Sequence, residues 1–133
     1  MSALDVQIDG KHYKTMKMQP IELAYKLNGS PCFCKLAKYL TRDKGDRLTN
    51  LKKAKHCIEL ELDLLNKGIG VDYALSYLHS VKANEIIREF TDNKDYQDAL
   101  IYLYNGFEEQ AIEVVDKLIK GVVGENNHTY QST

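Results

Sequence analysis

The sequence contains no run of apolar residues long enough to cross a membrane, which would take about 18 residues or more. It also lacks the basic start followed by an apolar stretch that is typical of a signal peptide. Neither sign of charge is in excess, because 18 Lys and Arg residues face 19 Asp and Glu residues. These absences predict a protein that works inside a cell, with no general affinity for nucleic acid and no membrane partner.

Cysteine is scarce, with three residues, and Cys32 and Cys34 lie too close together for an ordinary structural disulfide. An odd count with this spacing is typical of reduced thiols in a cytoplasm. Cys32 and Cys34 together with His56 and Cys57 could suggest a zinc site, but a spacing of one residue fits poorly with the usual ligand pairs. We interpret the three cysteines as small hydrophobic residues of the core.

The common enzyme motifs are missing too. The chain has no G-x-x-x-x-G-K-[ST] phosphate loop, no G-x-G-x-x-G, no H-E-x-x-H and no serine flanked by the glycines of a nucleophile elbow. Any affinity for phosphate must therefore come from a local cluster of cations, and any catalysis from an arrangement outside these classes.

Apolar residues recur at helical spacing along most of the chain, in short segments that turn residues separate. A length of 133 residues fits one domain. The expected helices run from Pro20 to Asn28, from Phe33 to about Asp43, from a cap at Thr49 or Asn50 to Lys67, from a cap at Asp72 to Asp92 with a break near Ser80 left open, from Tyr96 to Asn105, and from Ala111 to Gly121.

The pattern predicts an all-α fold, a compact bundle of about five to six short helices joined by short connections. Residues 1–121 form this single domain, and residues 122–133 are expected to be a flexible tail. Residues 4 to 18 differ from the rest, because Val6 and Ile8 alternate with polar neighbours before an Asp9-Gly10 turn signal. They predict an irregular or short-hairpin arm before the bundle.

The second expected helix carries a row of cations. Lys35, Lys38 and Arg42 are spaced by three and four residues, so they share one face of the helix. Like charges at this spacing repel each other unless water screens them or an anion binds against them. Tyr39 adds a ring able to stack on a base, and Lys44-Gly45 adds charge in a loop whose glycine lets the backbone approach a ligand.

Four short motifs in this region resemble, in order and spacing, those of a small bacteriophage family, the SaV-like proteins. They are His12-Tyr13, Gln19-Pro20-Ile21-Glu22, Lys38-Tyr39-x-x-Arg42 with the Lys44-Gly45 turn, and Leu51-x-Lys53-Ala54. The likeness covers residues 8–65, and the helices of residues 71–121 receive no assignment from it. The chain departs from the family at Cys34-Lys35, where Gly-Asn is common, and at Asn50, where Asp is common.

The resemblance implies a phage protein in the host cytoplasm that binds a nucleotide or nucleotide phosphate. One family member is a nucleotide kinase without the usual phosphate loop, which implies a deoxynucleoside monophosphate kinase that uses Mg²⁺ with the nucleotide. Other members are implicated in sensitivity to abortive infection, which implies instead a non-enzymatic protein that binds a host or defence protein. The candidate nucleotide-binding residues are His12, Tyr13, Lys35, Lys38, Tyr39, Arg42, Lys44 and Lys53.

The acidic residues support a competing hypothesis. All-α nucleotide pyrophosphohydrolases hold magnesium on carboxylates of facing helices, because a hard cation needs several converging oxygens. The pair Glu113-x-x-Asp116 fits half of that pattern, whereas Glu59, Glu61 and Asp63 do not form the E-x-x-E pair that would complete it. We interpret these residues as a solvated helix face and keep Glu113 and Asp116 as a weak alternative for metal binding.

The expected third helix offers a long apolar seam, from Leu51 to Leu65. The chain also has nine tyrosines and no tryptophan, which leaves amphipathic rings for its surface. A homo-oligomer is therefore expected rather than a monomer.

Overall fold

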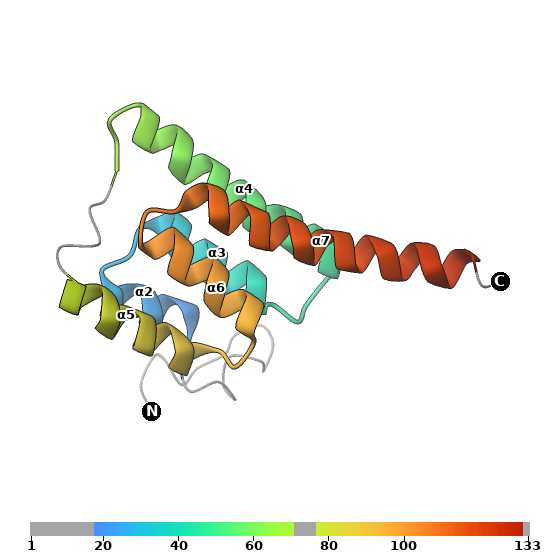
Figure 1. Ribbon diagram of the computed structural model, residues 1–133, viewed down its shortest axis with the longest axis horizontal. Coiled ribbons are helices and arrows are strands. Elements are labelled where there is room, and N and C mark those ends of the chain that lie inside the picture. The colour runs from blue at the N-terminus through green and yellow to red at the C-terminus, as the bar shows by residue number, and fades with distance from the viewer. Residues whose placement is uncertain (1–17, 71–76, 132–133) are drawn as a thin grey trace.

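The computed structural model describes residues 18–70 and 77–131. Within these ranges the chain forms six α-helices and no strand (Figure 1), which confirms the predicted all-α fold. The helices are α2 (Pro20–Leu27), α3 (Pro31–Thr41), α4 (Arg47–Asn66), α5 (Tyr77–Phe90), α6 (Lys94–Tyr104) and α7 (Glu108–Gln131).

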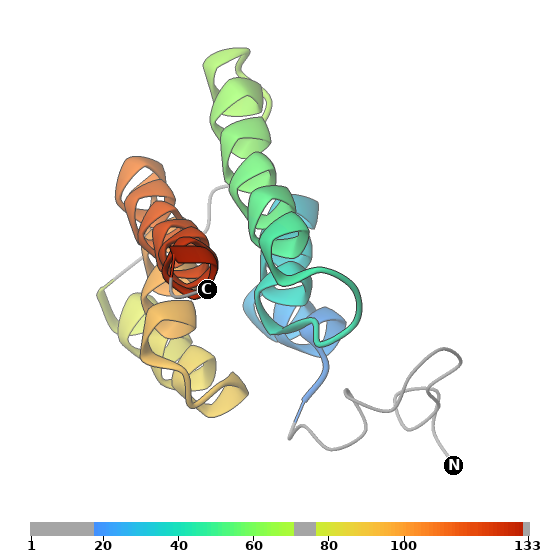
Figure 2. The ribbon, with the colours of Figure 1, turned by 90° about the vertical axis from the view of Figure 1, so that its right-hand side faces the viewer.

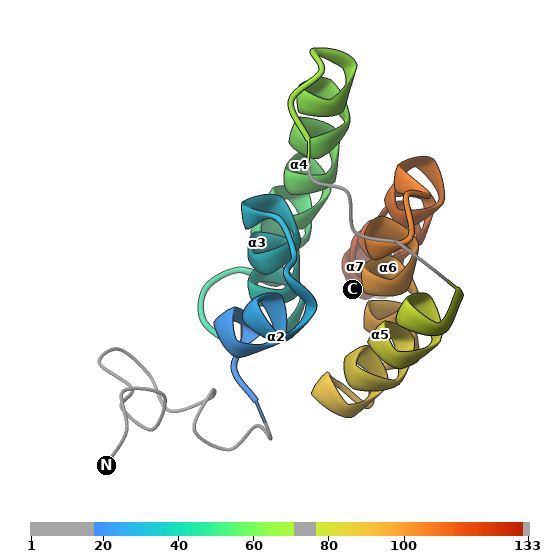
Figure 3. The same ribbon diagram turned by 90° about the vertical axis from the view of Figure 1, so that its left-hand side faces the viewer.

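The helices form two layers, each built from three consecutive helices. Figures 2 and 3 show α2, α3 and α4 on one side and α5, α6 and α7 on the other. Across the interface α2 contacts α5, α3 contacts α6, and α4 contacts α7, so each helix of the first half has one main partner in the second. The core lies between the layers and includes Leu23, Phe33, Leu36, Leu40, Ile58, Ile87, Leu100, Tyr104 and Val115.

Helix-capping residues set the limits of the first two described helices. Pro20 occupies the first turn of α2, where a missing N–H costs nothing, and Asn28 ends the helix in the left-handed conformation with a φ of 54°. The Ser30 side chain then caps α3 by accepting a hydrogen bond from the Phe33 N–H at 3.0 Å. Both predicted helices are confirmed, and the predicted apolar face of α3 is fully buried: Phe33, Leu36, Ala37 and Leu40.

Two predicted helix limits, the start of α4 and the end of α7, are wrong, and the break near Ser80 that the sequence leaves open does not occur. The cap of α4 is Asp46, not Thr49 or Asn50, because the Asp46 carboxylate accepts from both the N–H and the hydroxyl of Thr49. Helix α5 continues through Ser80 without a break, and α7 continues through Gly121 to Gln131. A glycine inside a helix costs only about 1 kcal/mol, which core contacts of neighbouring side chains offset.

Two other predictions concern the ends of the chain. The expected N-terminal arm lies outside the described residues except for Met18, which is buried, and the predicted cap Asp72 lies outside them as well. The expected tail from residue 122 is helical as far as Gln131, and its flexibility stays a prediction.

Among the described helices, none combines the length and the hydropathy that crossing a bilayer requires.

Tyr104 connects three helices in the middle of the bundle. Its hydroxyl donates to the carbonyl of Leu27, the last residue of α2, at 2.7 Å. The same hydroxyl lies 2.7 Å from Nε2 of His79 on α5. Its ring packs edge-on against Phe33, with centroids 5.6 Å apart. These contacts fix α2 and α3 against the second layer, and α3 carries Lys35 and Lys38.

Candidate functional site

The strongest cluster of predicted site residues lies where α3 and α4 pack against each other. The Tyr39 ring of α3 has two cations over it, with the Lys38 Nζ at 5.5 Å and the Lys53 Nζ at 5.6 Å from the ring centroid. Attraction between an ammonium group and a ring keeps both lysines near the same point. Two positive charges from different helices therefore meet at one aromatic side chain.

Lys35 lies one helical turn before Lys38 on the same face of α3, which packs against α4. Burial, followed by the neighbouring Cys32, raises the pKa of the Cys57 thiol to about 11, while the ammonium groups of Lys35 and Lys38 oppose this rise. Lys35 and Lys53 are exposed, and Lys38 is half-buried. The basic cluster, which we define as Lys35, Lys38, Tyr39 and Lys53, thus follows the seam between α3 and α4.

The loop from Arg42 to Asp46 adjoins the basic cluster and is held from several sides. Arg42 is the C-terminal cap residue of α3, in extended conformation. The Lys44 carbonyl accepts a hydrogen bond from the side-chain amide of Asn50 at 2.8 Å, and Asn50 is buried. Gly45 has a φ of 76°, which glycine adopts without strain. A fixed backbone places Arg42 and Lys44 at the end of the basic cluster.

Arg47 follows this loop in sequence but does not belong to the site. Its guanidinium donates to the Leu40 carbonyl at 3.2 Å and to the Tyr96 hydroxyl, and it lies 5.2 Å from the centroid of the Tyr96 ring. Tyr96 belongs to α6. Arg47 therefore ties the end of α3 and the start of α4 to the second layer.

The structure brings three of the eight predicted binding residues into direct contact, namely Lys38, Tyr39 and Lys53. It places Lys35 along the same seam and Arg42 and Lys44 in the adjoining loop. His12 and Tyr13 lie outside the described residues.

Four cations of the site differ in their surroundings from four lysines elsewhere in the described residues. Lys26, Lys55, Lys94 and Lys117 each form an ion pair with a carboxylate. Within the described ranges, Lys35, Lys38, Arg42 and Lys53 form no such pair. No carboxylate of the described residues therefore neutralises their charge, which an anion could do.

The interpretation of the cysteines as core residues holds for Cys57, whereas Cys34 packs against the core and Cys32 is not among its residues. Cys57 is buried, and Cys32 and Cys34 are half-buried. Burial raises the pKa of all three thiols, which keeps them protonated and unsuited to metal binding. No group of three or more His, Cys, Asp and Glu side chains with a metal-binding arrangement occurs in the part of the chain that the structure describes.

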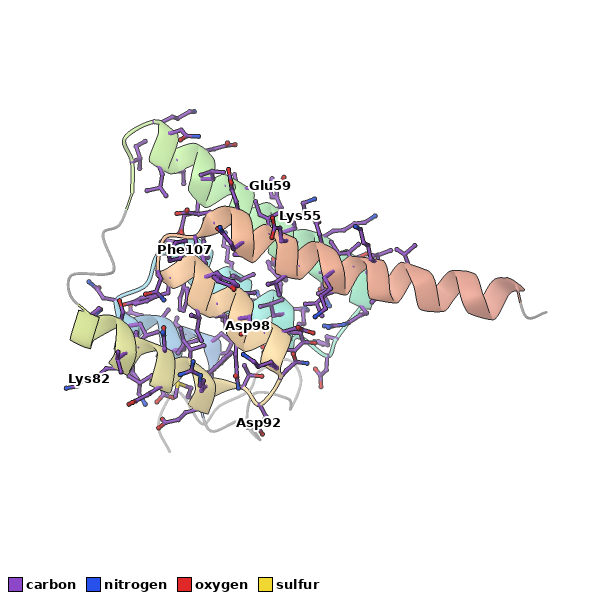
Figure 4. The ribbon with its side chains drawn as sticks, viewed as in Figure 1. Lys55, Glu59, Lys82, Asp92, Asp98 and Phe107 are labelled. Atoms are coloured by element: carbon purple, nitrogen blue, oxygen red, sulfur yellow. The ribbon has the colours of Figure 1, made fainter. Side chains whose placement is uncertain are left out.

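The acidic alternative gains no support from the geometry. The Asp116 carboxylate forms an ion pair with the Lys55 ammonium group, with 2.9 Å between Oδ1 and Nζ, and this pair joins α7 to α4. The Glu113 side chain is exposed. Figure 4 shows Lys55 and Glu59 on α4 beside α7. Glu61 is buried on another side of the helix, where the Ser30 hydroxyl donates to its carboxylate. These carboxylates do not converge as a magnesium site would require.

Two residues that hold the site are absent from the sequence-based candidates. Asn50 lies next to the buried Leu51 on α4, and a polar residue beside an apolar stripe is a signal for a buried hydrogen bond. The role of Arg47 gives no such signal, because its partner Tyr96 lies 49 residues further along the chain.

Comparison of the chain with protein-family models, with curated proteins and with solved structures gives no match. The SaV-like resemblance therefore stays a prediction that rests on the motifs alone.

Proposed function

We propose that the basic cluster binds the phosphate groups of a nucleotide. The observation that carries the proposal is the meeting of Lys38 and Lys53, from two helices, over the ring of Tyr39. Because the ring already holds both ammonium groups in place, the lysine side chains lose less conformational entropy when a phosphate binds. Arg42, in the next loop, adds a fork of donors that matches phosphate oxygens.

The SaV-like resemblance extends this proposal to a reaction, the transfer of a phosphoryl group to a deoxynucleoside monophosphate in the host cytoplasm. Such a transfer needs little covalent chemistry from the protein, because positioning and neutralisation of charge supply most of the catalysis. Lys35, Lys38, Arg42 and Lys53 would hold the phosphate oxygens. Mg²⁺, bound chiefly by the nucleotide phosphates, would supply further positive charge, since the described residues offer no carboxylate cluster for it.

The proposal is tested by thermal unfolding with deoxynucleoside mono- and triphosphates, with and without magnesium. A ligand present at a hundred times its dissociation constant should add about 2.7 kcal/mol to the free energy of unfolding. Lys38→Ala and Arg42→Ala should each weaken nucleotide binding by about 1.5 to 3 kcal/mol, the contribution of a charge-assisted hydrogen bond. Absence of any shift with every nucleotide would overturn the proposal.

Two control variants separate binding from folding. Lys82→Ala removes an exposed cation on α5, in the other layer (Figure 4), and should leave binding unchanged. Leu36→Ala removes a side chain that is fully buried, and it should lower the free energy of unfolding by about 2 to 5 kcal/mol whatever the function.

A second candidate function rests on another surface. The C-terminal part of α4 and the turn after it expose four large apolar side chains, Leu60, Leu64, Leu65 and Ile69. Exposed apolar groups on neighbouring helical turns favour an interaction surface for a host or defence protein, or for a second copy of the chain. Light scattering at micromolar concentration tests the homo-oligomer, which a mass of 15.2 kDa would exclude. Retention of a partner from host lysate by wild type but not by Leu64→Glu would support the protein partner.

A further inference from the structure

An open pocket lies between α2 and the start of α3, which are neighbours in Figure 3. Its volume of about 320 Å³ falls within the range of about 300 to 1,000 Å³ that small-molecule sites occupy. Residues of α2, of the turn that follows and of α3 line it, among them Ile21, Tyr25, Asn28, Gly29, Pro31 and Cys34.

The pocket offers an aromatic ring and an apolar wall to a ligand. Tyr25 is 83% exposed and Ile21 is 49% exposed, unusual values for residues of this size. They lie one helical turn apart on α2, away from the buried stripe of Leu23 and Leu27. A flat ring that entered the pocket would bury apolar surface that this helix leaves in water.

Cys34 joins this pocket to the basic cluster. It lines the pocket, and Lys38 follows it by four residues on the same face of α3, where the Lys38 ammonium group opposes the rise that burial causes in the pKa of the Cys34 thiol. The aromatic residue inside the basic cluster is unsuited to stacking, since Tyr39 already has two ammonium groups over its ring. A ligand with phosphates at Lys35 and Lys38 therefore has Tyr25, not Tyr39, as its accessible ring.

We propose that the pocket between α2 and α3 holds the base of a nucleotide whose phosphates contact Lys35 and Lys38, with Tyr25 stacked on the base. This inference rests on the proposed phosphate site and adds the part that recognises the base. Stacking on an aromatic side chain accepts any base, so it supplies affinity without selecting among bases.

We expect the side chain of Asn28 to select among the bases. Its side-chain amide carries both donors and an acceptor, it lines the pocket, and it forms no hydrogen bond with a described residue. Its backbone N–H is bonded to the Ala24 and Tyr25 carbonyls, which holds the residue in place at the end of α2. A side-chain amide at the edge of the pocket can pair with the donor and acceptor edge of a base.

The test compares deoxynucleoside monophosphates with 2-deoxyribose 5-phosphate, which keeps the phosphate and lacks the base, by titration calorimetry. Wild type should bind at least one nucleotide about tenfold or more tightly than the base-free compound, and Tyr25→Ala should lose most of that difference. Tyr25→Phe should keep it, because the ring and not the hydroxyl stacks. Neither variant should bind the base-free compound differently from wild type.

Asn28→Gly is the second variant, because glycine adopts the left-handed conformation freely and removes only the amide. It should reduce the preference among the four bases and keep the melting temperature of the free protein. Tyr25→Ala should also fold normally, since its side chain is largely in water.

The outcomes separate this inference from the proposed function. If the base-free compound binds as tightly as every nucleotide, or if Tyr25→Ala and Asn28→Gly bind nucleotides as wild type does, the pocket is not the base site and the phosphate site stands. If neither nucleotides nor the base-free compound bind, both are overturned. Loss of affinity in Tyr25→Ala without any loss in Lys38→Ala would overturn the phosphate site rather than the pocket.

Discussion

The ammonium nitrogen of Lys53, on α4, lies 5.6 Å from the centroid of the Tyr39 ring, on α3. Lys38 approaches the same ring to 5.5 Å. Because attraction to a ring depends on its π electrons and not on its hydroxyl, Tyr39→Phe should keep the binding of nucleotides. Tyr39→Leu should weaken it by about 0.5 to 1 kcal/mol for each lysine released. Calorimetric titration measures both, and equal losses in the two variants would contradict the role of the ring.

The contact between Arg47 and Tyr96 should appear as an energetic coupling between the layers. Arg47→Met removes the guanidinium, and Tyr96→Phe removes only the hydroxyl that accepts from it. A double-mutant cycle in urea should give a coupling free energy of about 0.5 to 3 kcal/mol. Additive effects of the two substitutions would show that the contact does not stabilise the fold.

Gly29→Ala should destabilise the protein. A Cβ at this position would lie 2.6 Å from Cδ1 of Phe33, and Phe33 is fully buried and unable to move away. Overpacking of this kind costs about 1 to 3 kcal/mol. Gly121→Ala is the matched control, because a Cβ there meets no atom within 4 Å, and alanine in a helix should stabilise by about 0.5 to 1 kcal/mol. Urea denaturation of both variants should show a lower free energy of unfolding for Gly29→Ala and a higher one for Gly121→Ala.

Acid should weaken the cap of α4. Hydrogen bonds from the backbone and the hydroxyl of Thr49 hold the pKa of Asp46 below its ordinary value of 3.8. A depressed pKa in the folded state contributes stability above the ordinary pKa, and this contribution is lost as the pH falls through and below 3.8. Asn also caps helices but does not titrate, so the stability difference between wild type and Asp46→Asn should shrink in that window. A difference that stays constant to pH 2 would contradict the assignment.

Cys57 should be the slowest of the three thiols to react. Its pKa of about 11, which burial raises first and Cys32 second, leaves roughly one thiol in a thousand ionised at pH 8. Brief treatment with iodoacetamide at this pH, followed by mass spectrometry, should find label on Cys32 and Cys34 before Cys57. Denaturant should abolish the order, and preferential labelling of Cys57 in the native protein would refute it.

The helical pattern predicts most of the fold because the buried face of a helix is encoded locally. The four buried residues of α3, Phe33, Leu36, Ala37 and Leu40, follow a single period. The start of α4 is harder, because Asp46, Thr49 and Asn50 are all good caps. Hydrogen bonds around the loop make the choice: the Asn50 side chain donates to the Lys44 carbonyl and the Thr49 hydroxyl donates to Asp46, which leaves Asp46 as the cap.

The end of α7 was mispredicted for a similar reason. Gly121 is a common stop signal, yet Leu118, Ile119 and Val122 around it pack against the core and keep the helix intact. In the candidate site, the shared face of Lys35 and Lys38 follows from their spacing. The approach of Lys53 to Tyr39 depends on how α3 packs against α4, and the presence of Tyr25 and Cys34 in one pocket depends on the turn between α2 and α3.

The pairing of helices across the two layers bears on how this protein can be divided. The motifs of the first half stop at residue 65, but α3 has its partner in α6 and α4 has its partner in α7. A fragment that ends at Gly70 would keep every described cation of the basic cluster, yet it would expose Leu36, Leu40 and Ile58 to water. The segment that carries the proposed phosphate site is thus not expected to fold on its own, and fragments designed along its boundary should aggregate unless the second half is supplied in trans.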